Sequence, residues 1–268
     1  MVRPDARRRQ VKPEPGGDPA GPTVALPHCY TGSQQVWTPV TRRLVAAGCR
    51  VIRYDQRGHG RSTAGSDGYT LAALGDDLAV VLAATHTRNA VLAGHSMGGM
   101  TIQSYAAQHL ADLHDRAKAV VLVDTAAYGL GAGGELTPRI AEGDFAQRWA
   151  ANVTYGGTFV RGTFGTWAYR EHLRLVADDY VNTPPDVRGA FAKQFPKMDY
   201  RKTLTQIQTP TAILAGSLDT LTPTRLSKLM HAKLPNSTLH ILPHKGHMTP
   251  LEAPEVIAST ILSRTTLQ

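Results

Sequence analysis

Six short apolar segments, separated by longer stretches of helical periodicity, constrain the fold of this chain more than any other feature. They comprise residues 23–26, 51–54, 90–93, 119–123, 211–215 and 238–242. Short, continuously apolar segments are typical of strands that are covered on both faces. Their alternation with helices predicts an α/β fold with a doubly wound, mostly parallel sheet.

The alternation stops between residues 128 and 208, where no strand-like segment occurs and most of the aromatic residues lie. Because aromatic side chains line ligand sites as well as small cores, we expect a helical cap here that contacts the substrate. The predicted domains are residues 1–22 as a flexible or edge-strand start, 23–127 and 209–268 as the core, and 128–208 as the cap.

Composition and cysteine usage favour a cytoplasmic protein. Of the 268 residues 42% are hydrophobic, and no segment approaches the roughly 20 apolar residues of a membrane span. The start has no apolar run of the secretory type. Two cysteines, Cys29 and Cys49, are too few for a disulfide framework.

The net charge of +8 comes from 29 basic and 21 acidic residues, which are scattered along the chain. The one basic cluster, formed by residues 7–9 and Lys12, lies in the start of the chain. Nucleic-acid binding requires a basic stripe or a recognition motif, so we expect no such partner. We expect instead a small apolar carbonyl substrate, bound by a monomer or a homodimer.

The strongest chemical signal is the hexapeptide GHSMGG at residues 94–99, which follows an apolar segment and opens a helical stretch of about 99–111. A serine between strand and helix is held in a strained backbone conformation that exposes its Oγ atom. The positions two before and two after it accept only small residues, and Gly94 and Gly98 occupy them. We therefore predict that Ser96 is a catalytic nucleophile.

A serine hydroxyl needs a base, and the base needs an acid that orients it. His247 lies just past the last apolar segment, and Asp219 follows the preceding one. We predict that these two residues complete a triad with Ser96, in the chain order typical of this serine turn. Asp124, at the end of the fourth segment, is the alternative acid. A histidine base predicts activity that rises with pH through an apparent pKa of about 6 to 7.

Two backbone amides are expected to form an oxyanion hole: the N–H of Met97, directly after the nucleophile, and the N–H of Tyr30, in the loop after the first segment. The residues expected to bind the substrate are His28, Cys29, His95, Trp149, Trp167 and Met248. No metal site is expected at His240, His244 and His247, because a strand that runs through Pro243 into a glycine loop turns these side chains apart. No cofactor is expected.

These motifs resemble the α/β-hydrolase fold family, in the branch that holds serine esterases, cofactor-free haloperoxidases and carbon–carbon bond hydrolases. The matching residues are His28, Gly32-Ser33, residues 54–62, residues 94–99, residues 216–219, Pro223, Gly246-His247, Glu252 and Pro254. Residues 94–102 and 120–125 look most similar to actinobacterial hydrolases. The resemblance implies a cap inserted between strands 6 and 7 of the family's sheet.

The chain departs from the family pattern in two places. Cys29 stands where the family usually has glycine, and residues 2–12 are arginine-rich where the family has its first two strands. A side chain at position 29 is expected to reshape the oxyanion hole or to reject bulky acyl groups.

The resemblance and the predicted triad indicate a serine hydrolase that cleaves an ester or thioester of a small-to-medium apolar substrate through an acyl-Ser96 intermediate. Carbon–carbon bond hydrolysis or perhydrolysis by the same triad stays open. A non-hydrolytic cyclase or lyase of natural-product biosynthesis, which only Cys29 favours, stays open as well. A third alternative is a ligand receptor that keeps the hydrolase residues.

Overall fold

The computed structural model describes residues 11, 13–63, 68–130 and 157–266, and within them seven strands form one sheet. Its order is β1-β3-β2-β4-β5-β6-β7, with β1 antiparallel to β3 and all other neighbours parallel. The strands are β1 (Glu14–Gly17), β2 (Thr23–Leu26), β3 (Arg50–Arg53), β4 (Ala90–His95), β5 (Ala117–Val123), β6 (Thr211–Gly216) and β7 (Ser237–Leu242). The predicted mostly parallel sheet is confirmed.

Successive strand residues point to opposite faces of the sheet and divide the core in two. Val24 and Leu26 of β2 pack in one cluster, whereas Ala25 between them packs in the other. In β5, Val121 and Leu122 separate in the same way. Both faces are buried, which explains why these strands form continuous apolar segments in the sequence.

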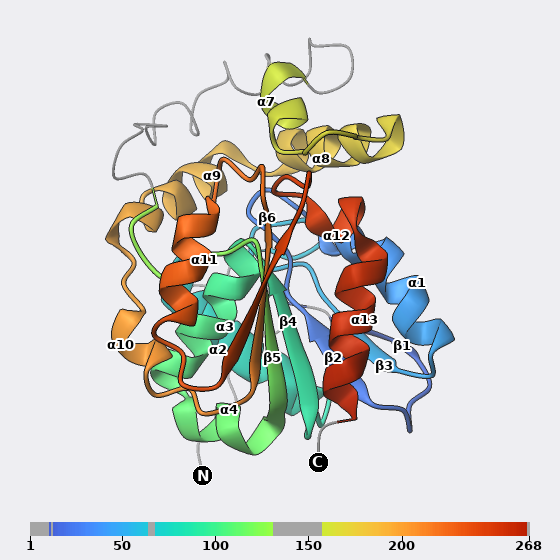
Figure 1. The fold of residues 1–268 in the computed structure, drawn as a ribbon, viewed down its shortest axis with the longest axis vertical. Coiled ribbons are helices and arrows are strands. Elements are labelled where there is room, and N and C mark those ends of the chain that lie inside the picture. The colour runs from blue at the N-terminus through green and yellow to red at the C-terminus, as the bar shows by residue number, and fades with distance from the viewer. Residues whose placement is uncertain (1–10, 12, 64–67, 131–156, 267–268) are drawn as a thin grey trace.

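Helices cover both faces of the sheet (Figure 1). α1 and α13 pack together on one face, and α2, α3 and α11 lie on the opposite face. The helices that flank the sheet are η2 (Gln34–Trp37), α1 (Thr38–Ala46), α2 (Leu71–Ala84), α3 (Met97–Gln108), α4 (Leu110–Arg116), α11 (Thr224–His231), α12 (Thr249–Glu252) and α13 (Pro254–Thr265).

Two local features concern the edge-strand start and the helix over about 99–111 that the sequence predicts. β1 has the sequence EPGG, which is poor in strand-forming residues, and it exists as an edge strand through its pairing with β3. The helix expected over about 99–111 ends at Gln108, because His109 leaves helical geometry with φ −133° and ψ 44° before α4 begins.

Between β5 and β6 the described residues form helices and no strand. These are α7 (Gly157–Gly162), α8 (Arg170–Asn182), α9 (Pro185–Ala192), η3 (Phe195–Lys197) and α10 (Arg201–Leu204). We call residues 157–208 the insertion. Figure 1 shows α7 and α8 at the end of the molecule to which the parallel strands run. The predicted boundaries of a separate cap at residues 128 and 208 stay a prediction.

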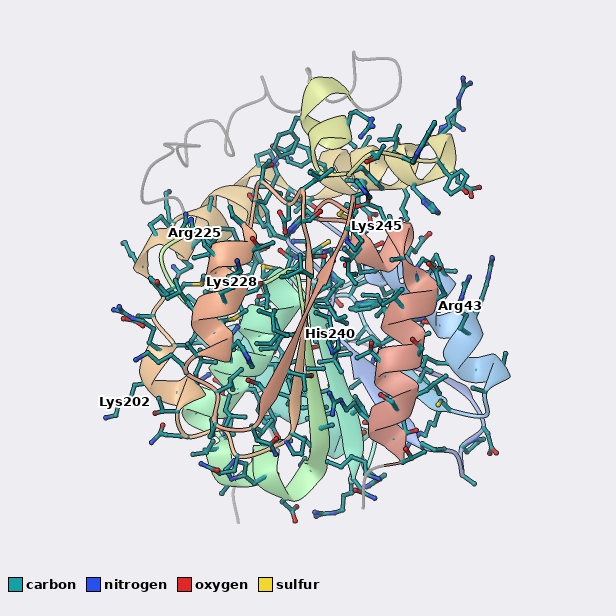
Figure 2. All side chains as sticks on the ribbon, viewed as in Figure 1. Arg43, Lys202, Arg225, Lys228, His240 and Lys245 are labelled. Atoms are coloured by element: carbon teal, nitrogen blue, oxygen red, sulfur yellow. The ribbon has the colours of Figure 1, made fainter. Side chains whose placement is uncertain are left out.

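Basic side chains come from several elements of the surface (Figure 2). Arg43 lies on α1, Lys202 on α10, Arg225 and Lys228 on α11, and Lys245 after β7. No helix in the described part of the chain has the length and apolar character that crossing a membrane requires.

Candidate active site

Ser96 lies in the tight turn between β4 and α3. Its backbone has φ 52° and ψ −116°, a conformation that persists in a non-glycine residue only where the surroundings enforce it. The Ser96 N–H donates to the Val123 carbonyl at 2.9 Å, and Thr125 Oγ1 donates to the Ser96 carbonyl at 2.7 Å. Hydrogen bonds to β5 and the residues after it therefore hold the turn.

Two glycines make this turn possible. A Cβ atom on Gly94 would lie 2.4 Å from the Gly98 carbonyl oxygen, and a Cβ atom on Gly98 would lie 2.1 Å from the Pro27 carbonyl oxygen. Both distances are far below van der Waals contact, so the predicted requirement for small residues on both sides of Ser96 is confirmed. Gly98 also lets the turn pack directly on the loop that follows β2.

The strand order explains why these two segments meet. The chain passes from β2 to β3 on one side of β2 and places β4 on its other side. Parallel α/β sheets bind ligands at such a reversal, outside the carboxyl ends of the strands. The Ser96 turn after β4 and the loop of residues 27–33 after β2 both lie at this point.

The loops after β6 and β7 bring Asp219 and His247 together. Asp219 Oδ2 lies 2.8 Å from His247 Nδ1, and both residues are buried. The Asp219 carboxylate also accepts hydrogen bonds from the Leu221 N–H at 2.8 Å, the Thr222 N–H at 2.9 Å and Thr222 Oγ1 at 2.6 Å. A carboxylate held in this way fixes the imidazole with its proton on Nδ1, which leaves Nε2 as the acceptor.

The contact stabilises the charged form of each partner. Burial by itself raises the pKa of Asp219, but the charge of His247 and the hydrogen bonds from His247 and Thr222 outweigh it and hold this pKa at about 2. Burial lowers the pKa of His247, but Asp219 outweighs it and raises this pKa above the ordinary value of 6.5. His247 therefore becomes a free base at a higher pH than an isolated histidine.

Asp124, the alternative acid, contacts other groups. It directly follows β5 in a fully buried position with φ 43°, and its Oδ1 accepts the Gly216 N–H at 2.8 Å. Thr249 Oγ1 donates to its second oxygen. Burial, followed by the nearby charge of Asp219, raises the pKa of Asp124 well above its ordinary value. Asp219 is the only acid in the described part of the chain that hydrogen-bonds the His247 ring. This contact favours Asp219 as the orienting acid.

The two predicted oxyanion donors lie on the segments that meet at Gly98. Met97 is the first residue of α3, where an amide N–H has no partner within the helix. Tyr30 is anchored to the insertion, because its hydroxyl donates to the Arg188 carbonyl at 2.9 Å and its ring packs edge-on against Phe195. Among the described residues, neither the Met97 nor the Tyr30 amide has a hydrogen-bond acceptor.

His28 and Cys29 are buried in the loop after β2. His28 uses both ring nitrogens, donating from Nδ1 to the Cys29 carbonyl at 2.7 Å and accepting the Gln56 N–H at Nε2 at 2.9 Å. The Cys29 thiol packs on Gly32 and in the core beside Trp37. Cysteine replaces the usual glycine without strain, since its φ is not positive. The predicted contacts of both residues with the substrate stay a prediction.

The other predicted pocket residues lie in different surroundings. Met248 packs in the core with Leu251 and Ile257. Trp167 is 83% exposed on the insertion, and its predicted contact with the substrate stays a prediction. Trp149 lies outside the described residues.

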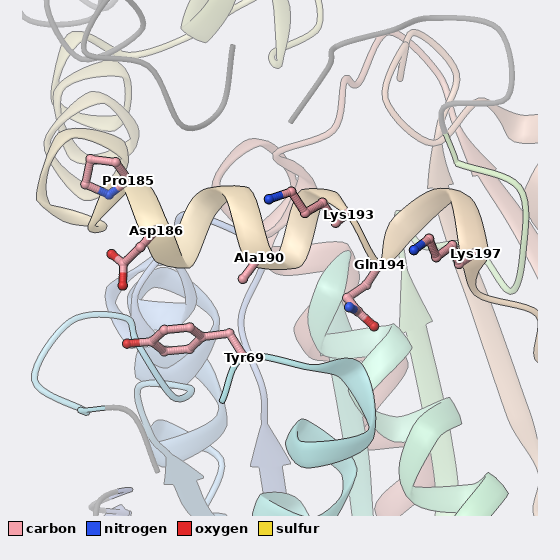
Figure 3. Close-up of a pocket in the computed structure, with 7 residues that line it drawn as sticks. All are labelled: Tyr69, Pro185, Asp186, Ala190, Lys193, Gln194 and Lys197. Carbon is pink, nitrogen blue, oxygen red and sulfur yellow. The ribbon is translucent and has the colours of Figure 1, made fainter. Parts of the chain in front are cut away.

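A pocket of about 660 Å³ opens elsewhere, between Tyr69 and the helices α9 and η3 (Figure 3). Its polar lining includes Asp186, Lys193 and Lys197. None of the three predicted triad residues lines it, so it is separate from the site around Ser96.

Two residues that hold the site have no assigned role in the sequence prediction. Thr222 hydrogen-bonds Asp219, and a hydroxyl residue three positions after an aspartate is the sequence signal of such a turn. Glu252 accepts the Gly246 N–H at 3.0 Å and the Gly165 N–H at 2.8 Å, which joins the His247 loop to the insertion. This long-range contact leaves no local signal in the sequence.

The link between Ser96 and His247 runs through His95. No hydrogen bond joins Ser96 Oγ to the His247 ring in the described structure, in which His247 Nδ1 contacts Asp219 and Thr222. His95 Nε2 instead lies 2.7 Å from the His247 carbonyl oxygen, so His95 contacts the His247 backbone, and its predicted substrate contact stays a prediction. Catalytic hydrogen bonds are often long without substrate and tighten when it binds.

Comparisons with known proteins agree with this geometry. Residues 22–254 match the family described as alpha/beta hydrolase fold. A protein of Variovorax paradoxus, provisionally named a carbamate hydrolase, is 32% identical over 238 residues, which are 86% of either chain. The chain belongs to the α/β-hydrolase fold family and is a hydrolase of that fold.

Two solved structures show the same architecture. A bromoperoxidase from Bacillus anthracis has a TM-score of 0.83 and 25% identity over 95% of this chain and 94% of that one. An esterase from Exiguobacterium antarcticum has a TM-score of 0.84 over 96% of both chains, and at 21% identity it supports the fold alone.

Proposed function

We propose that Ser96, His247 and Asp219 form a catalytic triad and that the protein hydrolyses an ester or thioester of a small-to-medium apolar substrate. The observation that carries this proposal is the buried 2.8 Å contact between Asp219 and His247 Nδ1, in the loops next to the strained turn of Ser96. This contact orients the imidazole and stabilises the cation that forms when His247 accepts the serine proton.

The reaction follows from these positions. Ser96 Oγ attacks the substrate carbonyl while His247 Nε2 takes its proton, and the amides of Met97 and Tyr30 stabilise the oxyanion. His247 then gives the proton to the departing alcohol or thiol, which leaves an acyl group on Ser96. Water, deprotonated by the same nitrogen, attacks this acyl group, releases the acid and restores the serine hydroxyl.

The preference for an apolar substrate rests on the side chains next to the proposed oxyanion donors. Met97 and Tyr30 belong to a cluster that also contains Met100 of α3 and Val187 and Phe191 of α9. Apolar walls with a few convergent polar groups are typical of sites for small molecules. The same triad serves several leaving groups on this fold, so the acyl and leaving groups must be found by screening.

The buried position of Cys29 weighs against a non-hydrolytic enzyme. That alternative depended on Cys29, whose thiol is buried and packs on Gly32 instead of the reacting centre. Burial, followed by the nearby charge of Asp179, raises the pKa of this thiol to about 12, so it is not a nucleophile near neutral pH.

The test is the intact mass of the protein after treatment with a fluorophosphonate, together with hydrolysis of p-nitrophenyl butyrate. The wild type should gain one adduct and release p-nitrophenol, and Ser96→Ala should lose the adduct and about 10⁴-fold or more in kcat. Ser259→Ala, which changes a surface serine on α13, is the matched control and should behave as the wild type. An adduct that persists in folded Ser96→Ala would overturn the proposal.

A further inference from the structure

His95 is the residue next to the proposed nucleophile, and its ring is completely buried. It packs edge-on against Trp37, with ring centroids 6.2 Å apart, and beside His247, with ring centroids 5.1 Å apart. Because β4 ends at His95 and the Ser96 turn follows at once, any contact that His95 makes is transmitted directly to the nucleophile.

The ring has one polar contact in the described structure. Nε2 lies 2.7 Å from the His247 carbonyl oxygen, and a carbonyl can only accept, so Nε2 carries the proton. Nδ1 is buried with no partner among the described residues. Burial, followed by the charge of His247, lowers the pKa of His95 to about 3, and the ring therefore stays neutral near neutral pH.

The backbone of His247 is held on both sides. Its N–H donates to the Thr163 carbonyl at 2.7 Å, and its carbonyl accepts the His95 Nε2–H. Thr163 belongs to the insertion and Asp219 to the loop after β6, so of these contacts only the one from His95 connects the base to the strand that carries Ser96. The side chains of Ser96 and His247 share no hydrogen bond in the described structure that could supply this connection.

We infer that His95 is a positioning residue that sets the distance between Ser96 Oγ and His247 Nε2 by holding the His247 carbonyl. The inference rests on the proposed triad. Without this hydrogen bond the carbonyl is left unsatisfied in a buried place and the loop shifts to find another partner. A displacement of about 1 Å between reacting groups can cost about 10²-fold in rate, even when the substrate still binds.

The test replaces His95 by Gln, Asn and Phe. The side-chain amide nitrogen of Gln is as many bonds from Cα as His Nε2, whereas that of Asn corresponds to Nδ1 and cannot reach the carbonyl. We express kcat per site that the fluorophosphonate labels. His95→Phe and His95→Asn should lower this kcat about 10²-fold, with KM within about threefold of wild type. His95→Gln should recover kcat to within about tenfold of wild type.

The same substitutions at His109, whose ring contacts Asp76 at the surface, are the control and should leave kcat unchanged. Equal losses for Gln and Phe, or a wild-type kcat for Phe, would overturn the inference. If His95→Phe does not fold, as judged by its thermal unfolding, the comparison of Gln with Asn decides. A wild type that the probe does not label at Ser96 would contradict the proposed function instead, which separates the two failures.

Discussion

Side chains are buried at the carboxyl ends of β4, β6 and β7 and exposed on the outer surface of the insertion. Ser96, Asp219 and His247 are all less than 8% exposed, and each is hydrogen-bonded to a residue of another segment. On the insertion, Trp167 and Tyr169 are 83% and 73% exposed. Sheet topology fixes the positions of Ser96, Asp219 and His247, because these residues could separate only if the strands of the sheet rearranged.

In its contacts with the core, the inner side of the insertion is intermediate between the strand ends and the outer surface. Asp179 of α8 accepts a hydrogen bond from Ser33 at 2.9 Å, and the Arg188 carbonyl of α9 accepts one from Tyr30. Both contacts reach the loop that carries a proposed oxyanion donor. The comparison therefore predicts a gradient, in which substitutions cost most at the strand ends, less inside the insertion and least on its outer surface.

The largest effect is expected at the acid. Asp219→Asn keeps the shape of the side chain but removes the charge that stabilises protonated His247, and it should lower kcat about 10⁴-fold, as loss of a triad acid does. Asp124→Asn is the matched control, and its loss should be much smaller, because Asp124 contacts Gly216 and Thr249 instead of the His247 ring. Steady-state kinetics at saturating ester measure both; a larger loss in Asp124→Asn would exchange the roles of the two acids.

The second effect concerns the inner side of the insertion. Phe191 of α9 is completely buried and packs against His59 and Tyr69. Phe191→Ala should lower the free energy of unfolding by about 3–5 kcal/mol, because it leaves a cavity between α9 and the core. Urea unfolding measures this as a lower midpoint with an unchanged slope. A loss below about 1 kcal/mol would mean that the insertion contributes little to the stability of the whole domain.

The strand ends and the insertion also differ in how much of them the sequence predicts. The positions of Ser96, Asp219 and His247 could be inferred because each follows a strand, and strands are visible as short apolar segments. Parallel strands end at the same edge, so local patterns suffice to place distant residues together. The glycines beside Ser96 carry a steric requirement that is equally local.

The surroundings of the predicted pocket residues could not be inferred in this way. Trp167 was expected at the site because of its type, and it is exposed next to Gly165 and Thr166, which hydrogen-bond Glu252 and the His244 carbonyl. Cys29 was expected to contact the substrate, and its thiol lies against Gly32 in the same core cluster as Trp37. The sequence left the start of the chain open between a flexible segment and an edge strand, and pairing with β3 makes residues 14–17 the edge strand β1. Each of these features is decided by contacts between segments that are far apart in the sequence.

The third effect is a pH dependence that tests the strand-end region alone. His247 must be neutral to accept the Ser96 proton, and Asp219 raises the pKa of His247 above 6.5. Activity should therefore rise with pH through a value above 6.5, falling about tenfold for each pH unit well below that value. In Asp219→Asn the midpoint of kcat/KM should move to lower pH. An unshifted midpoint would show that Asp219 does not set the charge of His247.

The smallest effect is expected on the outer surface of the insertion. Trp167→Ala removes a large side chain that is mostly in water, so the free energy of unfolding should change by no more than about 0.5 kcal/mol. Values of kcat/KM for short and long p-nitrophenyl esters should stay within about twofold of wild type. Tyr169→Ala is the matched control on the same surface. Suppose that Trp167→Ala, unlike Tyr169→Ala, lowers kcat/KM for the long esters and not for the short ones. The outer surface of the insertion then belongs to the substrate site, and the gradient from strand ends to insertion describes stability but not specificity.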